Sequence, residues 1–179
     1  DGKLDVVTAN YNSATISVLL GNGNGTFAPQ VTYSTGGNPT DIKLVDLNSD
    51  GKLDIVLAND GGNNIAVLLG NGDGTFGTRT TFAASSNPYF LTVGDFNADG
   101  KQDLAVANYS SNNVGVFVGK GDGTFFPQVT YAVGSNPTGI GSADFDGDGK
   151  LDLAVANLSN NTISILKGNG NGTFAAQVV

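Results

Sequence analysis

The sequence predicts an all-β fold built from a repeated unit of four short strands. Three observations support this prediction. An Asp-rich loop recurs at Asp46, Asp95 and Asp144, 49 residues apart, and a glycine-rich turn recurs in the same register. The apolar segments between them are three to six residues long. None shows helical periodicity over the roughly 10 to 12 residues that a helix needs, so a helical fold is excluded.

The composition is that of a folded domain. The chain has 179 residues, of which 39% are hydrophobic, and this is enough for a sizeable core. Glycine is abundant, with 27 residues, whereas Cys, Met, Trp and His are absent. The absence of Cys and His excludes disulfide, thiol and imidazole chemistry.

The negative charge is concentrated in the repeated loops. All 16 acidic residues are Asp, most of them lie in the recurring loop, and the net charge is -8. The eight basic residues form no cluster, so nucleic acid is not an expected partner. No apolar run approaches the roughly 20 residues of a membrane span, so membrane insertion is not expected either.

The first unit, residues 1–38, begins inside a copy of the loop. Residues 6–10 and 15–20 are apolar and are predicted to be strands. The glycines of residues 21–25 suit a tight turn, and residues 30–33 alternate like a strand with one solvated face. Residues 40–45 form a further strand that leads directly into the loop at Asp46.

The same order of strands repeats along the chain. We expect one domain, residues 1–179, with a partial blade at 1–38 and repeats at 39–87, 88–136 and 137–179. Four short antiparallel strands are the size of a propeller blade, whereas parallel solenoids have shorter coils. The sequence therefore favours a β-propeller with about four blades, the first of them incomplete.

The loop that begins at Asp144 carries the strongest chemical signal. It places four carboxylates within nine residues and then enters an apolar strand. Oxygens at loop positions 1, 3, 5 and 9 converge on one ion, the backbone carbonyl of Lys150 joins them at position 7, and Gly149 permits the turn at position 6. Oxygen ligands without His or Cys indicate Ca²⁺.

Other loop types fit the pattern less well. An EF-hand begins in the same way but needs an acidic residue at position 12 and flanking helices, and position 12 is Leu57, Val106 or Val155 here. Dockerin-like loops fail for the same reason. A hairpin without an ion does not require acidic residues at alternating positions. The Gly-Asn-Gly turn lacks the Lys-Ser/Thr of a phosphate-binding loop and precedes a strand.

The two motifs together resemble a known family. Asp-x-[Asn/Asp]-x-Asp-Gly-x-x-Asp before an apolar strand, with Gly-Asn-Gly-[Asn/Asp]-Gly-Thr-Phe further on, resembles the FG-GAP/VCBS repeats of integrin-like β-propellers over the whole chain. The resemblance implies a calcium loop between neighbouring strands of one blade. It also implies a role like that of adhesion receptors, lectins or secreted bacterial proteins. Gly-Thr-Phe and Asn-Pro replace the integrin signatures, which favours the bacterial-type branch.

The resemblance implies three full calcium sites and one partial site. Each full site takes four side chains and one backbone carbonyl, from lysine. The implied ligands are Asp46, Asn48, Asp50, Lys52 and Asp54; Asp95, Asn97, Asp99, Lys101 and Asp103; Asp144, Asp146, Asp148, Lys150 and Asp152; and, at the partial N-terminal site, Asp1, Lys3 and Asp5.

Aromatic residues also keep the register of the repeat. Phenylalanine follows each glycine-rich turn, and a Tyr or Phe recurs in the next strand. We expect both sets to pack between blades rather than to form a ladder that stacks on a ligand. The two sets are Phe27, Phe76, Phe125 and Phe174, and Tyr33, Phe82 and Tyr131.

These features predict a non-enzymatic, calcium-stabilised extracellular module for adhesion, surface display or protein–protein interaction. The alternatives are a lectin with sugar pockets between blades and a non-catalytic propeller within a larger secreted enzyme. Without His, Cys or Glu a general base would have to be an Asp, and the Asp residues outside the loops do not recur with a partner. The expected partner is a protein or glycan at the cell surface.

The first repeat is incomplete. The chain starts in the middle of a loop motif, which indicates an excerpt of a longer protein or a fragment that associates with itself to close the propeller. An unpaired strand edge favours such association.

Overall fold

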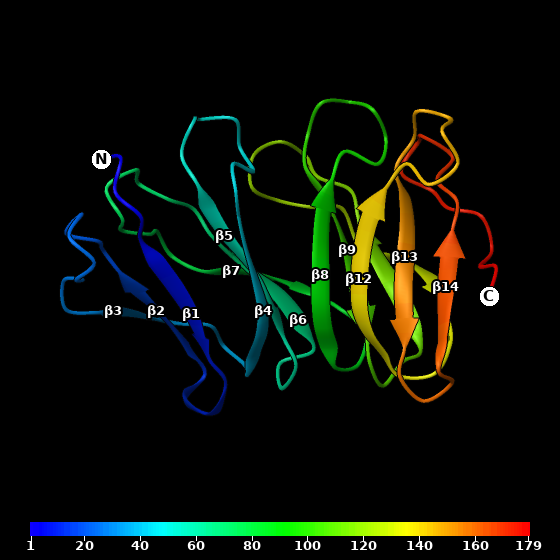
Figure 1. Cartoon of the computed structure of the whole chain (residues 1–179), viewed down its shortest axis with the longest axis horizontal. Helices are drawn as coiled ribbons and strands as arrows, with labels where there is room; N and C mark the ends of the chain where they lie inside the picture. The colour runs from blue at the N-terminus through cyan, green and yellow to red at the C-terminus, as the bar shows by residue number, and fades with distance from the viewer.

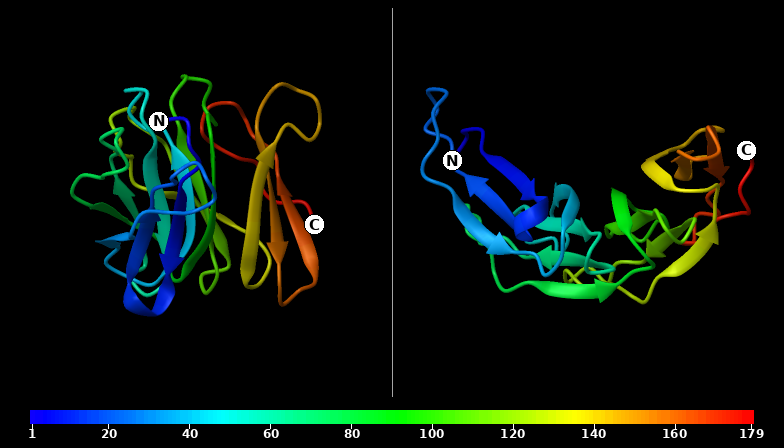
Figure 2. Two further views of the ribbon diagram at one scale, coloured as in Figure 1. Left: turned by 60° about the vertical axis from the view of Figure 1, so that its left-hand side comes forward. Right: turned by 90° about the horizontal axis from the view of Figure 1, so that it is seen from below.

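The fold is an open arc of four antiparallel β-sheets without an α-helix (Figures 1 and 2). It is seen in a computed structural model that describes residues 1–179. The first and fourth sheets form the two ends of the arc, and the two chain termini lie there (Figure 2). The predicted all-β, propeller-like fold of about four blades is confirmed.

Each sheet is built from consecutive strands. The first has three strands and a 3₁₀ turn, the second and third have four each, and the fourth has three. They comprise β1 (Val6–Asn10), the turn Tyr11–Ser13, β2 (Thr15–Leu19) and β3 (Val31–Ser34); β4 (Pro39–Val45), β5 (Asp54–Asn59), β6 (Asn64–Leu68) and β7 (Thr80–Ala83); β8 (Pro88–Gly94), β9 (Asp103–Asn108), β10 (Asn113–Phe117) and β11 (Val129–Ala132); and β12 (Pro137–Ala143), β13 (Asp152–Asn157) and β14 (Thr162–Leu166). The first sheet has no strand equivalent to β4, as the partial first repeat predicts.

The hairpin turns between the central strands depend on asparagine. The turn from β5 to β6 contains Asn63 at φ 47°, and Asn112 and Asn161 occupy the same position at φ 52° and 53°. Asparagine tolerates this left-handed conformation better than most residues. In the first sheet Ala14 takes the position, at φ 53°. The Asn-rich turns are therefore selected by backbone conformation.

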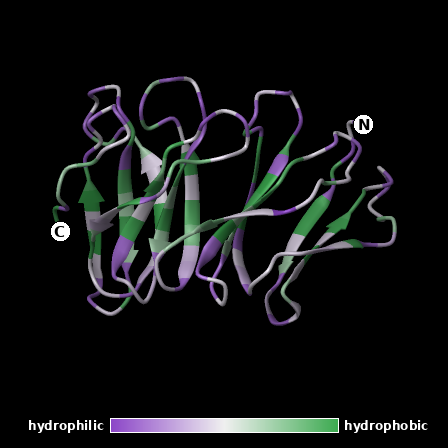
Figure 3. Ribbon diagram, turned by 180° about the vertical axis from the view of Figure 1, so that it is seen from behind, coloured by the Kyte–Doolittle hydropathy of each residue, from purple (hydrophilic) through white to green (hydrophobic).

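The hydrophobic core consists of three clusters, each between two neighbouring sheets. Successive side chains of a strand point to opposite faces, so Val56 packs toward the third sheet and its neighbour Leu57 toward the first. Strands β5 and β9 are consequently buried along their whole length. In Figure 3 the hydrophobic residues are concentrated in the strands, and the loops are mainly hydrophilic.

The predicted aromatic contacts between blades are confirmed. Phe76, Phe125 and Phe174 each meet an aromatic ring of the preceding sheet edge-on, with ring centroids 5.4 to 5.6 Å apart. The partners are Tyr33, Phe82 and Tyr131 respectively. Phe27 differs, because its side chain lies on the outer face of the first sheet and is 43% exposed.

A substitution at Phe96 tests how much these clusters contribute to the stability of the fold. Its side chain is 2% exposed between the third and fourth sheets, and its ring centroid lies 5.5 Å from that of Phe174. Substitution Phe96→Ala should lower the free energy of unfolding by about 3 to 5 kcal/mol, because it leaves a cavity. Urea denaturation measures this change.

Phe126 provides the matched control, because its side chain is 53% exposed and belongs to none of the three clusters. Phe126→Ala should change the free energy of unfolding by less than about 1 kcal/mol. Equal losses for the two variants would contradict the assignment of Phe96 to the core.

Candidate metal sites

The three complete acidic loops lie at one edge of the sheets. Each joins two neighbouring strands of one sheet, from β4 to β5, from β8 to β9 and from β12 to β13. These loops are at the top of Figure 1, and the short Asn turns are at the bottom. The connection implied by the family resemblance is therefore present at all three complete loops.

The carboxylate at loop position 9 is buried and fixed by two backbone amides. In the second sheet Asp54 accepts hydrogen bonds from Leu47 N at 2.9 Å and from Gly70 N at 2.8 Å. Asp103 and Asp152 make the same two contacts in their own repeats, and Asp5 makes the second one with Gly21 at 2.8 Å. The carboxylate at position 9 therefore links the acidic loop to the glycine-rich turn, which follows β6 in the second sheet.

Burial has an electrostatic consequence at Asp103. It raises the pKa of the carboxyl group, and the negative charges of Asp99 and Asp95 add to the rise, while the amides of Gly119 and Phe96 oppose it. A neighbouring positive charge would therefore favour the ionised form of this group.

A glycine follows β2, β6, β10 and β14 because the backbone passes very close. A Cβ atom on Gly70 would lie 2.2 Å from the carbonyl oxygen of Leu53, and one on Gly119 would lie 2.1 Å from that of Gln102. Sequence reasoning explained these glycines only as turn residues. The recurrence of this glycine once in every repeat was the available signal that another backbone segment passes close to it.

The other loop carboxylates organise the backbone of the loop. Asp144 accepts hydrogen bonds from Gly147, Asp148 and Gly149 at 2.7 to 3.1 Å, and the Gly149 amide is the main cause of its lowered pKa. Asp148 in turn accepts from the Lys150 amide at 3.0 Å. The loop is thus already folded around its acidic side chains, which retain lone pairs for a cation.

The second and third loops repeat this arrangement. In the second, Asp46 accepts from the amides of Asp50 and Gly51, and Asn48 accepts from Asp50. In the third, Asp95 and Asn97 make the same contacts with Asp99 and Gly100. The backbone carbonyls of Lys52, Lys101 and Lys150 remain predicted ligands.

The fourth loop brings three acidic groups closest together. One carboxylate oxygen from each of Asp144, Asp146 and Asp152 lies within 4.8 Å of the others, and the chain has no other such group of three acidic side chains. The second and third loops have Asn at position 3, so they hold one carboxylate fewer. An all-oxygen set of this kind fits a hard cation such as Ca²⁺.

Two lysines partly neutralise the fourth loop. Asp148 is outside the group of three, and its carboxylate binds the Lys150 ammonium at 2.8 Å. Lys167 donates to Asp146 at 2.9 Å. In the partial N-terminal site, Asp1 pairs with Lys3 at 3.0 Å. The loops thus contain exposed ion pairs that a bound cation would rearrange.

A second candidate site lies at the opposite edge, near the Asn turns. A cavity of about 310 Å³ is lined there by Asp60, Asn87, Tyr89 and Tyr109, together with Ser110, Thr138 and Leu158. The two tyrosine rings have centroids 5.8 Å apart. Sequence reasoning missed this site, because its residues come from three repeats and differ in chemistry at equivalent positions, as Asp60, Tyr109 and Leu158 do.

Asp60 is held in place within this second site. It accepts hydrogen bonds from the Tyr11 hydroxyl at 2.7 Å and from the Asn87 amide. The hydrogen bond to Asp60 is the main cause of a raised pKa of Tyr11. The carboxylate is therefore oriented by groups from two neighbouring repeats.

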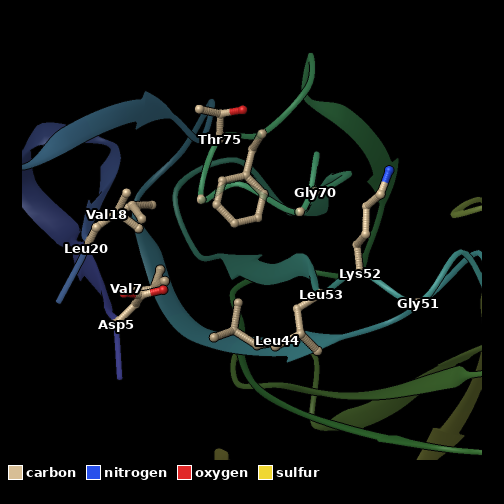
Figure 4. A pocket seen from close by; sticks show the side chains of 13 residues that line it. Asp5, Val7, Val18, Leu20, Leu44, Gly51, Lys52, Leu53, Gly70 and Thr75 are labelled. Carbon is tan, nitrogen blue, oxygen red and sulfur yellow. The ribbon is translucent and has the colours of Figure 1, made fainter. Parts of the chain in front are cut away.

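An apolar cleft of about 320 Å³ lies between the first and second sheets (Figure 4). It is lined by Val7, Val18, Leu44 and Phe76, among others. At the two other junctions the corresponding space is filled by the buried side chains of Leu47 and Phe96 from loop position 2.

Comparison with known proteins identifies the repeat. A family described as FG-GAP-like repeat matches residues 1–57, 46–106, 95–155 and 144–179. A search of curated proteins gave no match. No helix of the chain has the length and hydrophobicity required to span a membrane.

Solved structures share the fold at low sequence identity. A putative 6-phosphogluconolactonase from Bacteroides fragilis is 24% identical, with TM-score 0.75, and the match covers 98% of this chain and 53% of that one. An Agrocybe aegerita lectin that recognises non-reducing terminal N-acetylglucosamine is 21% identical, with TM-score 0.59, and coverage is 92% and 46%. The Vibrio cholerae biofilm matrix protein Bap1 is 22% identical, with TM-score 0.61, and coverage is 99% and 26%. The chain spans about half the length of the first two.

The close backbone approach at Gly119 can be tested directly. Gly119→Ala should lower the free energy of unfolding by roughly 3 kcal/mol, because the new methyl group would collide with the carbonyl oxygen of Gln102 and shift the backbone. The control is Gly141→Ala in β12, where a Cβ has no neighbour within 4 Å. Thermal and urea unfolding compare the two, and a Gly119→Ala variant as stable as the control would disprove the steric requirement.

Proposed function

Because the chain belongs to the FG-GAP-like repeat family, we propose that it is a calcium-stabilised propeller module that binds other molecules without transforming them. The observation that carries this proposal is the group formed by Asp144, Asp146 and Asp152, whose oxygens lie within 4.8 Å of one another. Like charges so close repel one another unless a cation lies between them.

The chemistry of the loops favours calcium over other ions. The ligands are carboxylate and amide oxygens, which soft metals do not prefer. Calcium accepts six to eight oxygens in flexible geometry, whereas magnesium demands a near-ideal octahedron. Each loop offers four side chains and one carbonyl, and water completes the shell.

The ion would act as a structural link. Asp152 is both an expected ligand and the acceptor of the Phe145 and Gly168 amides. A cation held by this carboxylate therefore connects the loop, the start of β13 and the turn after β14. Its role is to hold strands together, and the same connection exists in the second and third repeats.

Calcium removal should destabilise the fold strongly. At ten times Kd one site contributes about 1.4 kcal/mol, so three sites contribute about 4 kcal/mol of a typical total of about 5 to 15 kcal/mol. We expect the melting temperature to fall by roughly 10 °C when excess EGTA replaces calcium. Calorimetry measures the shift, and identical melting curves in the two buffers would refute structural calcium.

The number of sites can be tested with one substitution. Asp144→Asn keeps an acceptor for the loop amides but removes a charged ligand. Isothermal titration calorimetry should give three calcium ions for the native chain and two for this variant. Asp122→Asn is the control, because Asp122 lies in a glycine-rich turn and bonds only to Thr124. A stoichiometry unchanged by Asp144→Asn would contradict the assigned site.

An extracellular location follows from the same proposal. Extracellular calcium modules often bind the ion at about 10⁻⁴ to 10⁻³ M, a concentration that the cytosol does not supply. A role in adhesion or surface display is consistent with this location. The fold shared with the biofilm matrix protein Bap1 is compatible with such a role.

Carbohydrate recognition is a second candidate function, favoured by the cavity at Tyr89 and Tyr109. The tyrosine rings offer apolar surfaces that also carry hydroxyl groups, and Asp60 and Asn87 offer hydrogen-bond partners for sugar hydroxyls. Asp60 is already oriented by its bond to Tyr11. The lectin with this fold recognises terminal N-acetylglucosamine, so that sugar is a suitable first probe.

A glycan array in calcium buffer tests this candidate. Tyr109→Ala should weaken binding at least tenfold, which corresponds to about 1.4 kcal/mol, because it removes one wall of the cavity. Phe126→Ala serves as the control, since Phe126 does not line this cavity. The absence of binding to every glycan, or equal binding by both variants, would reject carbohydrate recognition.

A further inference from the structure

Both ends of the arc expose apolar side chains that belong to blade faces. On the fourth sheet, Phe145 is 52% exposed and Ile163 is 59% exposed. On the first sheet, Val6 is 41% exposed and Phe27 is 43% exposed. We name these the C-terminal face and the N-terminal face, and they lie at opposite tips of the arc (Figure 2). Clustered exposed apolar residues of this kind mark interaction surfaces.

The C-terminal face repeats a surface that is buried elsewhere in the chain. Phe145 occupies the repeat position of Leu47 and Phe96, both of which are buried between sheets. Ile163 occupies the position of Ile65 and Val114, which are fully buried. In each inner junction, these residues form the side of a sheet that packs against the next sheet along the chain.

The N-terminal face repeats the complementary surface. Val6 corresponds to Leu104 and Leu153, and both of these are fully buried. Phe27 corresponds to Phe125 and to Phe174, which are also buried. These residues form the side of a sheet that packs against the preceding sheet.

The junction between the third and fourth sheets shows how the two surfaces fit. Phe96 and Val114 of the third sheet pack in one cluster with Leu153 and Phe174 of the fourth. The C-terminal face corresponds to the side that the third sheet presents in this junction. The N-terminal face corresponds to the side that the fourth sheet presents. Each face therefore matches the other, and neither matches itself. Such a contact is heterologous and forms a ring if the rotation between copies closes.

We propose that two copies of this chain associate head to tail, with the C-terminal face of each copy packed on the N-terminal face of the other. The pair has two identical junctions and closes into one ring. The occupant of each face is a second copy because the residues of the two faces correspond, position by position, to the residues that pack together at the inner junctions. This inference does not depend on calcium or sugar binding.

Sedimentation velocity and light scattering test the assembly. The chain of 18.1 kDa should behave as a particle of twice that mass at micromolar concentration. Ile163→Asp and Phe27→Asp should each give a single copy, because the charge would be buried without a partner in both junctions. Both positions are exposed within one copy, so its own core stays intact, as circular dichroism should show.

Phe126→Asp is the matched control, because Phe126 is about as exposed as Phe145 but lies on neither face. This variant should remain a pair of copies. An equal loss of association in the control would show a general effect of added charge and overturn the assignment of the faces.

A mixture of the two face variants distinguishes head-to-tail contact from contact between like faces. In a mixed pair, one junction combines both substituted faces and the other combines two native faces. Mixing Ile163→Asp with Phe27→Asp should therefore restore pairs at reduced affinity. Contact between two C-terminal faces would instead leave Phe27→Asp fully associated, which overturns the proposal.

A native chain that stays a single copy at about 100 µM also overturns the proposal. That result would favour flanking repeats of a longer chain as the cover of the two faces. A pair that neither face variant disrupts would place the contact elsewhere on the molecule.

Discussion

The packing of one sheet face on the next is the constraint on which the structure depends. A strand alternates its side chains between two faces, so Val56 and Leu57 contribute to different clusters on opposite sides of one sheet. A four-stranded sheet cannot bury both faces by itself, and each repeat is therefore stable only between neighbours. The inner strands β5 and β9 are buried at every position for this reason, and the end sheets retain exposed apolar residues.

The acidic loops are coupled to this packing at loop positions 2 and 9. Phe96, at position 2, fills the junction between two sheets, and its amide donates to Asp103 at position 9. The same carboxylate binds the Gly119 amide, where the backbone leaves no room for a Cβ. A change in the geometry of the loop is therefore transmitted to the core and to the neighbouring turn. This coupling is the physical reason for assigning the loops a structural role.

The candidate metal sites and the candidate binding cavity lie at separate edges of the molecule. The acidic loops occupy one edge of the sheets, and the cavity with Tyr89 and Tyr109 lies near the opposite edge. The repeated residues serve the fold, whereas the cavity depends on residues that differ between repeats. At the position of Tyr89, for example, the other repeats have Thr40 and Thr138. A repeat scaffold can thus carry a cavity of varied lining without disturbing the register of its core.

The sequence by itself determined the fold class, the strand order and the loops that contain the candidate metal ligands. Asp46, Asp95 and Asp144 recur in a fixed register, and local patterns such as alternation and glycine turns predict strands without reference to distant residues. The aromatic contacts followed from the same register. These features are local or periodic, so one repeat predicts the next.

The tertiary structure alone decided which equivalent residues are buried and which are exposed. Phe96 and Phe145 share a repeat position, but only Phe96 has a sheet in front of it. The group of Asp144, Asp146 and Asp152, with Asp148 turned to Lys150, and the cavity at Tyr109 also depend on the placement of side chains in space. Burial is a property of neighbours distant in sequence, and periodicity cannot tell a junction between sheets from the end of an arc.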